Sequence, residues 1–163
     1  MRSPLARLVA RPQAALSCPD LAMTIYLFVY GTLLPGNVPS QLASIVDQFR
    51  VTGAAWVSGW LYDFGNFPGA VLEPRSSSII HGIAYEIPDH GVTLSTLDRY
   101  EGFDPRNPAS SPFLRKQTRA MLEDGRTISA WIYEYKGDTN AGVLIPSGTY
   151  PKAGCPARRK HSG

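Results

Sequence analysis

Two short segments of the chain carry the residues best suited to chemistry. The first is Leu97–Gly102, which holds two acids, Asp98 and Glu101, and ends in a glycine typical of helix termini. An acid at that end of a helix faces the negative end of the helix dipole. If the carboxyl is also buried, loss of hydration raises its pKa, and it can accept and return a proton near neutral pH. The alternative is that both acids are solvated and paired to Arg99 or Arg115.

The second segment is Tyr30-Gly31-Thr32-Leu33, which follows an apolar, β-branched run. Gly31 permits a sharp backbone turn directly after a strand. Such a turn can direct consecutive N–H groups into a concavity that binds a carboxylate or an oxyanion. The alternative is a plain turn.

Several other kinds of active site are excluded by the residue pattern. Gly31 and Gly36 have the spacing of the two glycines in a phosphate-binding loop, but Asn37-Val38 follows them in place of Lys-Ser/Thr. No Gly-x-Ser-x-Gly elbow is present. The two cysteines lie near the chain ends, and the three histidines are not at metal-ligand spacing, so we expect neither a metal nor a cofactor. His81 fits a catalytic base, but it fits better a hydrogen-bonded histidine on a mostly apolar strand face.

The elements that must position these residues are mostly strands. Glycine and proline are frequent, at 15 and 14 residues, which argues against a helical bundle. Alternating and apolar runs predict strands at 24–30, 51–63, 70–73, 79–87, 113–122 and 127–135. Helices are predicted near 40–49 and at 92–101, the second with Thr93 as its N-cap. This inventory predicts an α+β fold, and the glycines inside bent strands favour a small closed or half-closed barrel.

The net charge of +3 on 163 residues is concentrated at the two ends of the chain. Residues 1–22 carry +2, residues 152–163 carry +4, and the stretch between them carries −3. We expect one domain at 23–151 between a disordered basic extension (1–22) and a disordered basic tail (152–163). An organelle transit peptide is the alternative for the extension. No apolar run can span a membrane and no basic stripe crosses the domain, so we expect a cytoplasmic protein that binds neither membrane nor nucleic acid.

Seven segments of the chain, taken in order, resemble those of one known family. They are Phe28–Leu33, Gly65–Ala70, His81–Ile87, Leu97–Gly102, Phe113–Arg115, Ala130–Tyr135 and Ile145–Gly148. Together they resemble the γ-glutamylcyclotransferase-like superfamily, which includes the AIG2-like proteins. The resemblance covers about residues 24–150 and implies a small mixed β-barrel with flanking helices.

The resemblance also implies an activity and a site. Enzymes of the family cyclise a γ-glutamyl conjugate to 5-oxoproline and release an amine or amino acid. By this resemblance Glu101 is the acid/base, and the backbone of Tyr30, Gly31, Thr32 and Leu33 holds the γ-glutamyl head. Two further side chains, Arg115 and Tyr133, are candidates for substrate contact, and Phe67 and Pro68 for the cavity rim.

Two departures from the family pattern bear on the site. Phe113 stands where the family often has tyrosine, and Thr149 stands where an acid is common. The alternative to an enzyme is a non-catalytic module of the same fold that binds a small molecule.

Overall fold

A closed, mixed β-barrel of five strands forms the centre of the molecule. The computed structural model describes residues 23–88 and 90–151. The barrel strands are β1 (Ile25–Val29), β2 (Arg50–Asp63), β4 (Ile79–Ile87), β5 (Phe113–Leu122) and β6 (Thr127–Tyr135). They pair in the order β2-β4-β1-β6-β5, and β5 pairs back onto β2 to close the ring. Only the β1–β6 pair is parallel.

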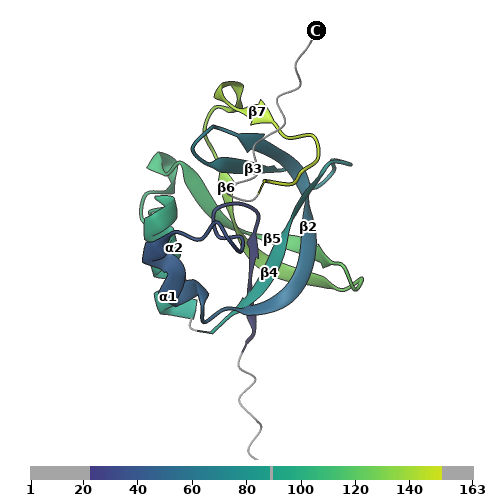
Figure 1. Cartoon of the computed structure of the whole chain (residues 1–163). Coiled ribbons are helices and arrows are strands. Elements are labelled where there is room, and N and C mark those ends of the chain that lie inside the picture. The colour runs from purple at the N-terminus through teal and green to yellow at the C-terminus, as the bar shows by residue number, and fades with distance from the viewer. Residues whose placement is uncertain (1–22, 89, 152–163) are drawn as a thin grey trace, which may run out of the picture.

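The remaining elements extend the barrel at one end and cover one side of it (Figure 1). Strands β3 (Pro68–Leu72) and β7 (Val143–Leu144) both pair with the last part of β2. The α-helices α1 (Ala43–Val46) and α2 (His90–Glu101) lie together on one side. The described residues also contain three 3-10 turns: η1 (Ser40–Leu42), η2 (Pro108–Ser110) and η3 (Thr139–Ala141). None of the helices in these residues is long and apolar enough to cross a bilayer.

The alternation of side chains along β1 divides the core into two parts. Phe28 and Tyr30 point into the barrel, whereas Leu27 and Val29 face the helices. The barrel interior combines large side chains with small ones, as is typical of narrow barrels. Alanines from four barrel strands, Ala55, Ala84, Ala120 and Ala130, make room for larger side chains such as Phe28. The second core, beneath α2, includes Leu94 and Leu97, as their helical spacing predicts.

The predicted fold class, α+β with a small mixed barrel and flanking helices, is confirmed. The strands at 79–87, 113–122 and 127–135 have the predicted limits. The predicted strand at 70–73 instead runs from Pro68 to Leu72. The expectations for residues 1–22 and 152–163 lie outside the described residues.

Both helix predictions need correction. The helix expected near 40–49 ends at Val46, because Gln48 and Phe49 form tight i→i−3 hydrogen bonds that turn the chain into β2. The second helix begins at His90, so Thr93 is buried inside its first turn and is not the N-cap.

Candidate functional site

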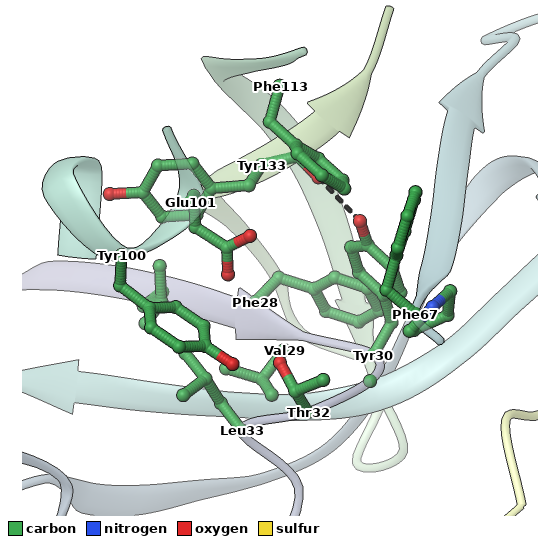
Figure 2. A pocket seen from close by; sticks show the side chains of 13 residues that line it. Phe28, Val29, Tyr30, Thr32, Leu33, Phe67, Tyr100, Glu101, Phe113 and Tyr133 are labelled. Carbon is green, nitrogen blue, oxygen red and sulfur yellow. Dashed lines mark hydrogen bonds between the residues drawn. The ribbon is translucent and has the colours of Figure 1, made fainter. Parts of the chain in front are cut away.

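A cavity of about 270 Å³ opens between the end of β1 and the end of α2 (Figure 2). Its lining comes from β1, the loop after it, the β2–β3 connection, the end of α2 and the strands β5 and β6. The lining residues are Leu27, Phe28, Val29, Tyr30, Gly31, Thr32, Leu33, Phe67, Pro68, Tyr100, Glu101, Phe113 and Tyr133. Two segments that are 70 residues apart in the sequence, around Gly31 and Glu101, therefore meet in one cavity.

Glu101 is the last residue of α2, and the way the helix ends fixes its position. Gly102 adopts a left-handed conformation with φ of 72°. The Phe103 N–H then donates to the Asp98 carbonyl oxygen at 2.8 Å, which closes the helix with a Schellman-type turn. The sequence predicted this stop at Gly102, and Figure 2 shows the Glu101 carboxylate directed into the cavity.

Burial gives this carboxyl group unusual acid–base properties. Loss of hydration raises the pKa of Glu101 from an ordinary 4.5 to about 7. Among the residues that line the cavity, Glu101 alone carries a formal charge. No hydrogen-bond donor or cation within the described part of the chain pairs with it. Its protonated and ionised forms are therefore both populated near neutral pH.

The loop after β1 lines the same cavity and contains backbone donors that are not used within the fold. The Gly31 carbonyl oxygen accepts from the Leu34 N–H at 3.0 Å and from Asn37 Nδ2 at 3.4 Å, which fixes the turn. The N–H groups of Gly31, Thr32 and Leu33 have no acceptor in residues 23–88 and 90–151. Consecutive free N–H groups at a cavity wall are suited to binding an anion.

Strand β3 is fastened over this end of the barrel by two side chains. The buried Tyr30 hydroxyl donates to the Tyr133 carbonyl oxygen at 2.7 Å and accepts from the Ala70 N–H. Glu134 accepts from the Leu72 N–H at 2.9 Å. Burial raises the pKa of Tyr30 far above its ordinary value, so it stays protonated. These bonds hold Pro68 against Gly31.

A buried polar network lies behind the Tyr133 ring. The Tyr133 hydroxyl donates to Asp98 Oδ1 at 2.7 Å, and Arg115 Nη1 donates to both Asp98 oxygens, at 2.9 and 3.1 Å. The Arg115 guanidinium also lies over Trp131, 5.0 Å from the ring centroid, and over Phe103 at 5.7 Å. This cluster connects α2 to β5 and β6.

The structure brings most of the predicted site residues together. Glu101, Tyr133 and the four residues from Tyr30 to Leu33 line the cavity, as do the predicted rim residues Phe67 and Pro68. Arg115 is not in the lining; it is bound to Asp98, the pairing that the sequence left open. His81 is exposed and lies outside the cavity lining.

Sequence reasoning missed Tyr100 as a lining residue. Its spacing from Leu97 placed it on the apolar side of the helix, and it does pack partly against the core. Its position next to Glu101 at a helix end was the available signal. No group of three or more metal-ligating side chains occurs in the described residues.

The raised pKa of Glu101 predicts a pH-dependent stability. Between pH 4.5 and 7 the folded protein keeps a proton that the unfolded chain releases, so stability falls as the pH rises through this range. The full loss is about 3 kcal/mol. In Glu101→Gln this contribution is absent, and the difference between the two proteins in urea unfolding free energy should grow by about that amount from pH 4 to pH 8. A constant difference would contradict burial of the charge.

The contact between Gly31 and Pro68 gives a second prediction. A methyl group on Gly31 would collide with Cγ of Pro68, whereas Cβ of Pro68 would lie at an ordinary 3.6 Å. We expect Gly31→Ala to cost about 1–3 kcal/mol in unfolding free energy.

Pro68→Ala removes the colliding atom and supplies the control. The double variant Gly31→Ala/Pro68→Ala should therefore be less destabilised than the sum of the two single variants. Additive losses in urea unfolding would show that the collision is not the cause.

Comparisons with known proteins identify the family of the chain. The family model described as gamma-glutamyl cyclotransferase, AIG2-like, matches residues 27–152. A curated relative from Methanocaldococcus jannaschii, named "Putative gamma-glutamylcyclotransferase", is 30% identical over 125 residues, which is 77% of this chain and 94% of the relative.

Two solved structures share the fold. An AIG2-like protein from Mus musculus superposes with a TM-score of 0.62 at 18% identity, over 80% of this chain and 90% of that one. YkqA from Bacillus subtilis superposes with a TM-score of 0.58 at 22% identity, over 78% of this chain. The match covers 40% of YkqA, so this chain corresponds to less than half of that protein.

Proposed function

Because the chain belongs to the gamma-glutamyl cyclotransferase, AIG2-like family, we propose that it converts a γ-glutamyl conjugate into 5-oxoproline and a free amine or amino acid. The observation that carries this proposal is one cavity that holds both an unpaired, buried carboxyl group and a row of free backbone donors. The substrate would be a small molecule, in keeping with a cavity of about 270 Å³.

The reaction needs no nucleophile from the protein. The α-amino nitrogen of the glutamyl group attacks its own δ-carbonyl carbon, a new C–N bond closes the five-membered ring, and the original amide C–N bond breaks. The α-ammonium first loses a proton to solvent and becomes the neutral amine nucleophile. As the ring closes, one further proton leaves the attacking nitrogen and one is delivered to the departing nitrogen. The protein must hold the chain in a folded conformation, which is an orientation effect, and must move these protons.

Glu101 is the proposed acid/base. With a pKa of about 7, the carboxylate can take a proton from the attacking amine nitrogen as the ring closes and then deliver that proton to the leaving nitrogen. The same group serves both steps in turn, and its position inside the cavity supports contact with both nitrogens.

The free N–H groups of Gly31, Thr32 and Leu33 are the proposed binding site of the glutamyl head. They would bind its α-carboxylate or stabilise the oxyanion that forms during attack. Either role uses donors that are already oriented by the turn at Gly31. Tyr133 would contact the substrate with its ring, because its hydroxyl is bound to Asp98.

The test is release of 5-oxoproline from a panel of γ-glutamyl compounds that includes glutathione and γ-glutamyl-lysine. Turnover of any member supports the proposal. Binding of the panel without 5-oxoproline release would instead identify a non-catalytic binding module.

A further inference from the structure

The cavity has two chemically distinct parts. Its polar groups are the Glu101 carboxyl, the free amides of Gly31–Leu33 and the uncharged hydroxyls of Thr32 and Tyr100. The remaining wall is formed mainly by aromatic rings and aliphatic side chains. Figure 2 shows the Glu101 carboxylate between the Tyr100 ring on one side and the rings of Phe67 and Phe113 on the other.

The aromatic part of the wall is held rigidly. Phe67 stacks on Phe64 at a centroid distance of 5.2 Å and meets Phe113 edge-on at 5.7 Å and Tyr135 at 5.8 Å. Phe113 and Tyr135 also contact each other at 5.4 Å. A ring fixed on three sides presents a preformed flat surface, so a ligand ring that stacks there loses little to ordering of the protein.

The charges of the cavity restrict the ligand further. No lysine, arginine or histidine lines it, and the nearby Arg115 donates to both oxygens of Asp98. The three free amides suffice for the single α-carboxylate of the glutamyl head. A second carboxylate, next to the scissile nitrogen, would be desolvated beside Glu101 without a counter-charge.

We infer that the leaving group is an arylalkylamine, with a flat apolar body that packs on Phe67 and Phe113 and no carboxylate beside the scissile nitrogen. This inference rests on the proposed function and specifies its substrate class. It makes Phe67 and Phe113 the residues that determine specificity. Phe113 contributes because it is apolar at a position where a tyrosine hydroxyl would add a polar atom.

Three conjugates that differ by one group each test the inference: γ-glutamyl-phenethylamine, γ-glutamyl-phenylalanine, which adds a carboxylate, and γ-glutamyl-ethylamine, which lacks the ring. We expect kcat/KM for 5-oxoproline release to be about tenfold higher for the phenethylamine than for the ethylamine conjugate. The phenylalanine conjugate should be about 100-fold poorer than the phenethylamine conjugate.

Substitutions of Phe67 test whether the aromatic wall causes these kcat/KM ratios. Phe67→Ala, or Phe67→Leu if the first does not fold, should bring the phenethylamine-to-ethylamine ratio close to one. Phe67→Arg supplies a cation for the added carboxylate and should reduce the phenethylamine-to-phenylalanine ratio of kcat/KM. Trp60→Ala removes an aromatic side chain outside the cavity, 38% exposed, and should leave both ratios unchanged.

The outcomes separate this inference from the proposed function. If kcat/KM for the ethylamine or the phenylalanine conjugate equals that for the phenethylamine conjugate, the inference is wrong and the proposed function stands. If the wild-type ratios are as expected but are unaffected by the Phe67 variants, the assignment to this wall is wrong. If neither these conjugates nor the wider panel yields 5-oxoproline, the proposed function fails, and the inference fails with it.

Discussion

Glu101→Gln should lower kcat for 5-oxoproline release by about 10³-fold or more and leave the fold intact. A glutamine side chain has nearly the same shape but cannot accept and return a proton, and general acid–base catalysis typically contributes 10²- to 10⁴-fold. Here one carboxyl would act in both proton transfers, and no other charged side chain in the described lining could replace it. Because the proposed binding of the substrate is mainly to the loop amides, KM should change little.

The matched control is Glu123→Gln, the same substitution at an exposed position in the β5–β6 turn. It should retain wild-type kcat. Far-UV circular dichroism and urea unfolding should show that both variants are folded. Full activity of Glu101→Gln would show that Glu101 is not the acid/base, and it would not affect the fold assignment.

Replacement of Arg115 should cause the largest loss of stability. Arg115→Met keeps much of the side-chain volume over Trp131 but leaves the carboxylate of Asp98, a side chain that is 8% exposed, without its counter-ion. Removing one partner of a buried ion pair costs about 3–5 kcal/mol. Urea unfolding at neutral pH measures this loss directly.

Two further variants show whether the unpaired charge is the cause. Arg115→Met/Asp98→Asn removes both charges and should recover most of the stability, because replacing a whole buried pair is often close to neutral. Arg126→Met breaks the exposed pair with Asp124 and should cost less than about 1 kcal/mol. Equal losses at Arg115 and Arg126 would contradict a special role for burial.

Local sequence patterns were sufficient for most of the fold. The alternation in 79–87 and the Asp124-Gly125 hairpin signal predict their strands to the residue, because such patterns are set by short-range geometry. Barrel closure is different, since the β2–β5 pairing joins Ala55 to Leu122 and no local signal marks it. The bent strands suggested a barrel only as one possible arrangement.

The residues of the candidate site were predictable where they lie at the end of a helix or a strand. Glu101 stood out as an acid beside a helix-terminating glycine, and Gly31 as a turn directly after a strand. The resemblance to a family then joined them. Arg115 shows the limit of this reasoning. Its residue type suits substrate binding, but its guanidinium donates to both carboxylate oxygens of the buried Asp98.

The parallel β1–β6 pair, described above as a feature of topology, also determines when the cavity can form during synthesis. Tyr30 donates to the Tyr133 carbonyl oxygen across 103 positions of the chain. At about 5–20 residues per second, a ribosome would add β6 some 5–20 s after β1. Throughout that interval the nascent chain would contain the Gly31 turn, and later Glu101, but not yet the Tyr133 side of the cavity. Contacts of such long sequence separation are also slow to close, so folding of the released chain should take milliseconds to seconds. The chemistry proposed for this protein would therefore begin only after the last barrel strand has left the ribosome.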